Sequence, residues 1–154
     1  MCAECAAGFF QPLPAQTSCI ECSAGSYQSN NGQVDCTNCS VGTYSSIGSS
    51  ICTECEAGRQ QTQEGSELCV ECEYGTFKAA AGTANCSACP TGKYTSAATT
   101  LVACASCAVG TIQPLAGQEG CEDCDAGKHQ HMTGQEECES CGVGSFLLVL
   151  SRPN

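Results

Sequence analysis

The apolar positions of this chain follow no sustained helical or strand period. Instead, one short pattern of apolar and polar positions returns every 16 to 18 residues along the 154-residue sequence. Each copy has a CxxC pair, a glycine three residues after the second cysteine and, in most copies, an aromatic ring two residues further on. A fixed period of this kind predicts a repeat array rather than a globular domain. The nine CxxC pairs begin at Cys2, Cys19, Cys36, Cys52, Cys69, Cys86, Cys104, Cys121 and Cys138.

The glycine after each CxxC pair is present in all nine copies. We therefore expect a backbone requirement at this position, either a positive φ or a close approach that a Cβ atom would block. The nine glycines are Gly8, Gly25, Gly42, Gly58, Gly75, Gly92, Gly110, Gly127 and Gly144.

The ring position is the main apolar position of each copy, and it is followed by a polar stretch. Most polar stretches contain a second glycine, such as Gly32 or Gly65, which predicts a turn. Each copy thus predicts a short extended piece, a turn and a short return to the next CxxC pair, without helices. The rings are Phe10, Tyr27, Tyr44, Phe77, Tyr94 and Phe146.

The predicted fold class is a small disulfide-rich repeat protein, an elongated ladder of about nine 17-residue units with short β-hairpin-like pieces and no conventional core. We expect residues 1–154 to form one continuous array, slender in shape, whose last unit is incomplete. The final unit departs into an apolar run at residues 146–150, which is too short to span a bilayer. We expect the chain to be a segment of a longer array, and this run to be a candidate contact with a neighbouring subunit.

Composition explains why cysteine must take over the role of a core. Leu, Ile, Val and Phe make up 22 of 154 residues, whereas there are 18 cysteines and no tryptophan. So few apolar residues with a net charge of -11 would indicate disorder. The cysteine content instead indicates covalent cross-links.

The favoured pairing joins the second cysteine of one unit to the first cysteine of the next, so that each loop encloses a glycine, a ring and a turn. Closing a loop of about 15 residues contributes about 3 kcal/mol in the loop-entropy model. Pairing within a CxxC is the competing connectivity, although its ring is small and strained. The favoured scheme leaves Cys2 and Cys141 unpaired and gives Cys5–Cys19, Cys22–Cys36, Cys39–Cys52, Cys55–Cys69, Cys72–Cys86, Cys89–Cys104, Cys107–Cys121 and Cys124–Cys138.

Two other chemistries compete for the cysteines. Pairs of CxxC knuckles can bind zinc, but nine knuckles do not divide into pairs, and each four-thiolate site would add negative charge to an acidic chain. Dithiol catalysis needs a CxxC pair at a helix N-terminus in an α/β domain, which the sequence does not predict. We expect no bound cofactor or metal. No nucleophile with a base and no phosphate loop emerges, so we expect no enzymatic activity.

The charges restrict the partners. With 16 acidic and 5 basic residues, nucleic acid and anionic membrane are unfavourable partners. Acidic residues recur beside the second cysteines, as at Glu4, Glu21, Glu54 and Glu71. They are either a solvated acidic stripe, which is the favoured interpretation, or a ladder of calcium ligands.

Three smaller features are candidate sites. Asn38 and Asn85 each begin an N-C-S sequence that fits the N-glycan acceptor pattern, although the middle cysteine disfavours both. His129 and His131 alternate, which on a strand would place both rings on one face and would allow metal capture; the plainer interpretation is that His129 fills the ring position.

The complete unit, as in Cys19-Ile-Glu-Cys22-Ser-Ala-Gly25-Ser-Tyr27 through Gly32 to Cys36, resembles the ephrin-receptor-like cysteine-rich repeat and the first module of tumour necrosis factor receptor cysteine-rich domains. The resemblance covers eight units and half of the ninth. It implies an extracellular ladder of disulfide-closed loops with the pairing given above. Receptors alternate such modules with others, whereas arrays this uniform are similar to those of protist and algal surface and fibre proteins.

These observations favour an extracellular or cell-surface structural segment, a stiff disulfide-stabilised rod within a surface or filament-forming glycoprotein. Such a rod would associate with its own copies into a fibre or with neighbouring repeats of the same protein. The alternative is a receptor or adhesion ectodomain that binds a protein ligand. Off-pattern anchors for such a ligand are few, namely Phe9, Arg59 and Tyr74.

Overall fold

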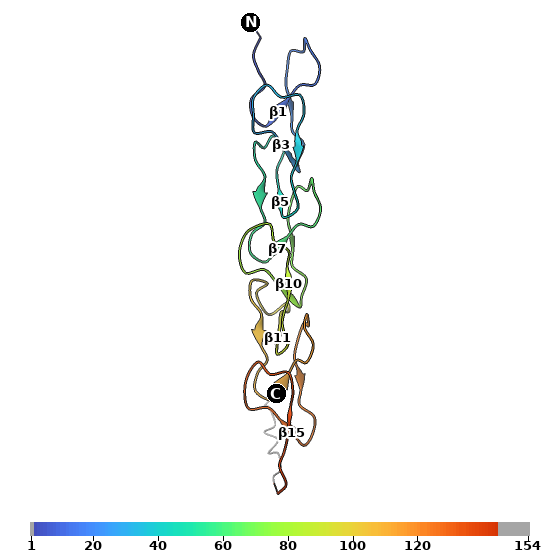
Figure 1. The fold of residues 1–154 in the computed structure, drawn as a ribbon, viewed down its shortest axis with the longest axis vertical. Helices are drawn as coiled ribbons and strands as arrows, with labels where there is room; N and C mark the ends of the chain where they lie inside the picture. Colours follow the sequence, from blue (N-terminus) through green and yellow to red (C-terminus); the bar gives the residue numbers. More distant parts are fainter. Residues whose placement is uncertain (1, 145–154) are drawn as a thin grey trace. The chain divides into compact units, whose positions relative to one another are not determined.

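The structure is a computed structural model that describes residues 2–144. The Cα trace forms two compact units. The first comprises Met1–Cys72 with Lys78–Cys86, and the second comprises Glu73–Phe77 with Ser87–Asn154. Both are built from the same element, a two-residue strand that pairs antiparallel with a second two-residue strand across a disulfide-closed loop (Figure 1).

The first unit contains four of these hairpins. The two residues after each motif glycine form the first strand, and the two residues inside the next CxxC pair form the second. In the first hairpin, Phe9 lies opposite Glu21 and Phe10 lies opposite Ile20. The four pairs are β1 (Phe9–Phe10) with β2 (Ile20–Glu21), β3 (Ser26–Tyr27) with β4 (Thr37–Asn38), β5 (Thr43–Tyr44) with β6 (Thr53–Glu54), and β7 (Arg59–Gln60) with β8 (Val70–Glu71).

The second unit repeats the arrangement in the same register. Among residues 2–144 there is no helix, and hence none that could cross a membrane. The prediction of a helix-free ladder of short hairpins is confirmed. The four pairs are β9 (Thr76–Phe77) with β10 (Ser87–Ala88), β11 (Lys93–Tyr94) with β12 (Ala105–Ser106), β13 (Thr111–Ile112) with β14 (Glu122–Asp123), and β15 (Lys128–His129) with β16 (Glu139–Ser140).

The motif glycine makes the turn that leads into each first strand. At the first hairpin, the Phe9 amide donates to the Ala6 carbonyl over 3.0 Å, and Gly8, the third residue of the turn, has a φ of 85°. A positive φ at this place defines a type II turn, which favours glycine. All nine motif glycines have a positive φ, as the sequence predicts.

The second glycine forms the turn at the far end of the loop. Gly32 has a φ of 69°, and its amide donates to the carbonyl of Cys5 in the preceding repeat over 2.8 Å. In the first loop the equivalent residue is Ala15, which adopts a φ of 59°. In six loops, the far turn therefore ties the loop to the repeat before it.

The interior is made of sulfur and polar side chains. Cys22, Cys39, Cys55, Cys89 and Cys107 are fully buried, whereas large apolar residues such as Ile47 and Leu115 are exposed. The rings of the repeat, such as Tyr27 and Tyr44, are half-buried. The absence of a conventional core among the described residues is thus confirmed, and the rings do not replace it.

Candidate functional site: the cross-linked repeat interior

Eight disulfides close the loops of the array. Each joins the second cysteine of one repeat to the first cysteine of the next, with Cα atoms 5.7–5.8 Å apart. Cys2 and Cys141 are free. None of the nine CxxC pairs is closed on itself. The bonds are Cys5–Cys19, Cys22–Cys36, Cys39–Cys52, Cys55–Cys69, Cys72–Cys86, Cys89–Cys104, Cys107–Cys121 and Cys124–Cys138.

Each CxxC segment connects two consecutive loops. In the second repeat, Cys19 closes the first loop and Cys22 opens the next one. The Cys22 amide also donates to the Gly8 carbonyl over 2.9 Å, which extends the hairpin by one hydrogen bond. A four-residue segment is therefore fixed by two disulfides and by a strand ladder. The thiolates that a zinc site would require are used in these bonds.

A polar residue lies three residues after the motif glycine in every loop, directly after the ring position, and it is buried in seven of the eight loops. In the second loop this residue is Gln28, which is 7% exposed. Its Nε2 donates to the Asp35 carbonyl over 2.9 Å, and its Oε1 accepts from the Asn30 amide over 3.0 Å. One side-chain amide thus bridges the two legs of the loop, a contact that we call the glutamine clamp.

The glutamine clamp recurs with the same two bonds in five loops. The sequence prediction missed it, although the recurrence of glutamine one residue after the ring position is visible in the sequence. The five clamp residues are Gln11, Gln28, Gln61, Gln113 and Gln130.

In the other three loops, a different polar side chain occupies this position and donates the hydrogen bonds. Ser45 donates to the Ser26 carbonyl over 2.9 Å, and Thr95 donates to the Thr76 carbonyl over 3.0 Å. Lys78 is 5% exposed, and its Nζ donates to the carbonyls of Gly82 over 2.6 Å and Cys55 over 3.1 Å. Buried polar groups are stable when they are hydrogen-bonded, and here backbone carbonyls provide the partners.

Backbone bonds also join each of the first seven repeats to the repeat that follows it. Within the first unit, the Gly8 amide donates to the Gln28 carbonyl over 2.7 Å, and the Gly25 amide donates to the Ser45 carbonyl over 2.9 Å. Within the second unit, the Gly92 amide donates to the Gln113 carbonyl over 2.7 Å. The motif glycine of one repeat therefore binds the backbone of the buried polar residue in the next.

In five repeats the motif glycine also lies against the repeat after next, whereas a Cβ atom on Gly110, Gly127 or Gly144 would meet no atom within 4 Å. A Cβ atom on Gly8 would fall on the carbonyl oxygen of Gly48, and one on Gly75 would fall on that of Gly117. The sequence predicts either a positive φ or a close approach at this glycine, and both occur in these five repeats. The lack of space for a Cβ atom and the positive φ are two separate reasons why these positions require glycine.

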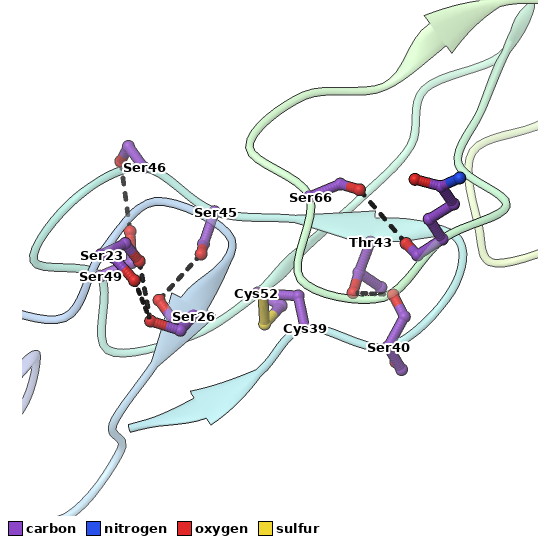
Figure 2. The surroundings of a disulfide bond; sticks show 11 residues. Ser23, Ser26, Cys39, Ser40, Thr43, Ser45, Ser46, Ser49, Cys52 and Ser66 are labelled. Atoms are coloured by element: carbon purple, nitrogen blue, oxygen red, sulfur yellow. Dashed lines mark hydrogen bonds between the residues drawn. A yellow bond between two sulfur atoms is a disulfide. The ribbon is translucent and has the colours of Figure 1, made fainter. Parts of the chain in front are cut away.

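Serine and threonine side chains lie around the Cys39–Cys52 disulfide of the first unit (Figure 2). The Thr43 hydroxyl donates to the Ser40 carbonyl over 2.7 Å. The Ser26 hydroxyl makes the equivalent bond to the Ser23 carbonyl over 2.8 Å. Each side chain reinforces the turn around its motif glycine, and this local pattern explains the abundance of Ser and Thr after that glycine.

The acidic residues beside the cysteines lie on the surface. Arg59 and Glu71 form a cross-strand ion pair over 3.1 Å, with both side chains about half exposed or more. Among the described residues, the acidic side chains next to the second cysteines gather into no group of three ligands. This arrangement agrees with a solvated acidic stripe.

The remaining predicted residues lie in separate places. Asn38 and Asn85 are both exposed, each beside a disulfide-bonded cysteine. His129 and His131 stack with ring centroids 6.0 Å apart, so they do share one face. The apolar run at 146–150 lies outside the described residues.

A comparison with family models finds a match to two segments of the chain. The model of the tyrosine-protein kinase ephrin type A/B receptor-like family matches residues 15–46 and 60–100. No curated protein matches the chain significantly. The first matched segment includes the Cys22–Cys36 loop, and the second includes the Cys72–Cys86 loop.

Proposed function

Because the chain is a cysteine-rich repeat array with ephrin-receptor-like segments at 15–46 and 60–100, we propose that it is an extracellular structural segment that acts as a stiff rod. The observation that carries the proposal is the double linkage of the repeats. Each loop is closed by a disulfide, and its motif glycine is hydrogen-bonded to the following repeat. The rod belongs to a cell-surface or filament-forming glycoprotein and has no catalytic role.

Stiffness follows from the number of independent restraints on each repeat. Around Gly25, one hydrogen bond reaches the next repeat, and the backbone of Gly65 in the repeat after next lies in van der Waals contact. Bending within the first unit would have to break such contacts on one side. Since repeat arrays are stabilised by nearest-neighbour interfaces, added interfaces to the second neighbour raise the free energy of local opening.

The eight structural disulfides support an extracellular location, because they would not persist in a reducing compartment. The acidic surface keeps the rod soluble, and the negative charges of two neighbouring copies repel each other. Ordered association into a fibre therefore needs a specific contact between copies, and the apolar run at 146–150 is our candidate for it. Asn38 and Asn85 are exposed and supply acceptor positions for N-linked sugar.

Electron microscopy of the oxidised chain tests this function. We expect slender particles that become shorter and irregular in outline when a phosphine reductant is added. A Cys39→Ser/Cys52→Ser double variant should introduce one flexible point, since it removes a central disulfide of the first unit. The matched control is Cys2→Ser, which removes a free thiol and should leave the contour unchanged. Compact particles in the oxidised protein would overturn the rod.

The state of assembly separates the structural proposal from its alternative. Long fibres would support a filament protein, and replacing Leu147, Leu148 and Leu150 by serine should then abolish them. Discrete monomers would favour a receptor or adhesion ectodomain. For that alternative, Tyr74 is the off-pattern aromatic residue to substitute first, because its side chain is 47% exposed.

A further inference from the structure

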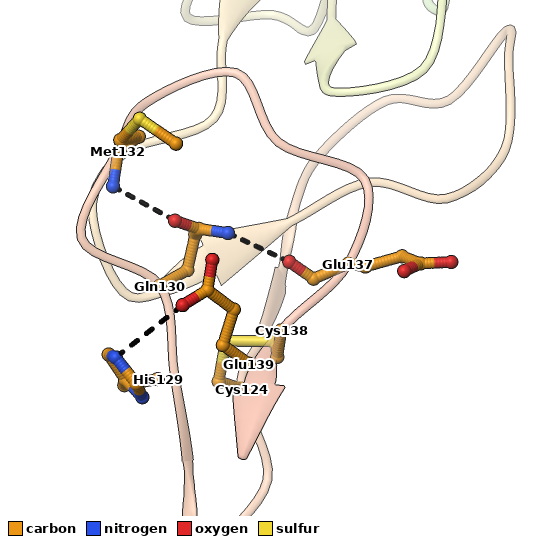
Figure 3. Close-up of polar contacts among 7 residues, drawn as sticks. All are labelled: Cys124, His129, Gln130, Met132, Glu137, Cys138 and Glu139. Atoms are coloured by element: carbon orange, nitrogen blue, oxygen red, sulfur yellow. Dashed lines mark hydrogen bonds and ion pairs between the residues drawn. A yellow bond between two sulfur atoms is a disulfide. The ribbon is translucent and has the colours of Figure 1, made fainter. Parts of the chain in front are cut away.

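Two histidines and one carboxylate come together on the last described hairpin of the second unit. His129 lies in β15 and is the cross-strand partner of Glu139 in β16. Figure 3 shows the resulting contact, in which Nε2 of His129 lies 3.9 Å from Oε2 of Glu139. His131 stacks on His129 with an interplanar angle of 26°. Ligand atoms of all three residues lie within 4.8 Å of one another.

The backbone between the two histidines is held in place. Gln130 is 4% exposed and forms the glutamine clamp of this loop, with bonds to the Glu137 carbonyl over 2.9 Å and from the Met132 amide over 3.0 Å (Figure 3). Its two neighbours lie on one face of the loop, where His131 is exposed and His129 is partly buried. The clamp thus fixes the starting points of both imidazoles, which reduces the entropy lost when a ligand binds.

One imidazole nitrogen in this group has no partner. Nδ1 of His129 is buried and makes no hydrogen bond, and it is the one such side-chain atom among the described residues. A buried polar atom without a partner is unfavourable, and the nitrogen available to a ligand is the other one, Nε2, which lies beside Glu139. In the other repeats the ring position is usually held by Phe or Tyr, which would not create this cost.

We propose that His129, His131 and Glu139 bind one divalent transition-metal ion of the Zn²⁺ type. Imidazole and carboxylate are ligands that Zn²⁺ favours, and three protein ligands leave a fourth position for water. Ligand atoms around a tetrahedral Zn²⁺ are about 3.4 Å apart, so groups within 4.8 Å of one another must approach by up to about 1.4 Å. The side chains of His129 and Glu139 are 42% and 55% exposed, which gives them the freedom to do so.

This hairpin differs from its neighbours in ligand type. Among the described residues, no other group of three His, Cys, Asp or Glu side chains converges in this way. In the preceding hairpin, Glu122 has the position of Glu139, but its cross-strand partner is Ile112. Glu122 therefore serves as a matched control carboxylate for the test.

Isothermal titration of the whole oxidised chain with ZnCl₂, in the presence of excess MgCl₂, tests the proposal. The parent protein should carry Cys2→Ser and Cys141→Ser, because free thiols also bind Zn²⁺. We expect one Zn²⁺ per chain. His131→Ala and Glu139→Gln should weaken binding tenfold or more, whereas Glu122→Gln should leave it within twofold.

His129→Tyr keeps the fold testable, since tyrosine occupies the same position in three other repeats. This variant should keep the circular dichroism spectrum and all eight disulfides yet bind Zn²⁺ at least tenfold more weakly. A parent chain that binds no Zn²⁺ overturns the proposal. The proposal is also overturned if the His129→Tyr and His131→Ala variants bind Zn²⁺ with the same affinity as the parent chain.

Discussion

The carbonyl oxygen of Gly65 lies where a Cβ atom of Gly25 would be. The two residues belong to repeats that are separated by a whole repeat, and Gly25 also has a φ of 84°. Gly25→Ala therefore has two unfavourable effects: its Cβ atom clashes with the backbone of Gly65, and residue 25 keeps a φ that disfavours an L side chain. We expect it to lower the free energy of local opening in the first unit by about 3 kcal/mol. Amide hydrogen exchange at residue 25, whose N–H binds the Ser45 carbonyl, measures this change.

Gly48→Ala is the control for that substitution. Gly48 has a φ of 69°, but a Cβ atom on it would meet no atom within 4 Å. The backbone conformation alone should cost about 1 kcal/mol. Equal effects of the two substitutions would show that the contact between alternate repeats contributes nothing.

The glutamine clamp can be tested within one loop. Gln113 is 4% exposed and binds the Gly120 carbonyl over 2.6 Å and the Leu115 amide over 3.0 Å. We expect Gln113→Ala to cost about 2 kcal/mol, since it removes two part-buried hydrogen bonds from one loop. Faster hydrogen exchange at the Leu115 amide should report the loss.

Gln118, in the same loop, provides the comparison. Its Nε2 binds the Ala116 carbonyl over 3.2 Å in an exposed position. Gln118→Ala should change stability by less than about 0.5 kcal/mol. If both alanine variants exchange alike, the clamp is not a source of stability.

Lys78 replaces the clamp in its own loop. Because its Nζ binds two carbonyls from a buried position, Lys78→Met keeps much of the volume but removes both bonds. We expect this variant to lose about 1–3 kcal/mol in thermal or denaturant unfolding. Lys78→Gln should lose less, because glutamine fills the same position in five other loops. The opposite order of stability would contradict the equivalence of the two residues.

Ala15 offers a stabilising substitution. It has the place of the second glycine in the first loop and adopts a φ of 59°, which disfavours an L side chain. Ala15→Gly should stabilise the Cys5–Cys19 loop by about 1 kcal/mol, measured by the thermal transition of that loop. Ala116→Gly is the control, since Ala116 has no positive φ and the substitution should be neutral or destabilising.

Sequence reasoning predicted the repeat, the hairpins and the backbone demand at Gly25, because each depends on spacing or on one residue type. It missed Gln28 as an interior residue. Attention to the apolar positions singled out the ring of Tyr27 and passed over its polar neighbour, yet the disulfides fill the interior and leave room for a hydrogen-bonded amide. The approach of Gly25 to Gly65 could not be predicted either, since a linear period does not show how successive repeats rotate.

The polar interior has a consequence for how the protein responds to temperature. The positive heat capacity of unfolding comes from apolar surface, and exposed polar groups reduce it. Opening the loop around Gln28 and the Cys22–Cys36 bond would expose mainly amide and hydroxyl groups. The stability curve of each repeat should therefore be flat, so that cold weakens the array little and the same fold serves over a wide range of temperatures.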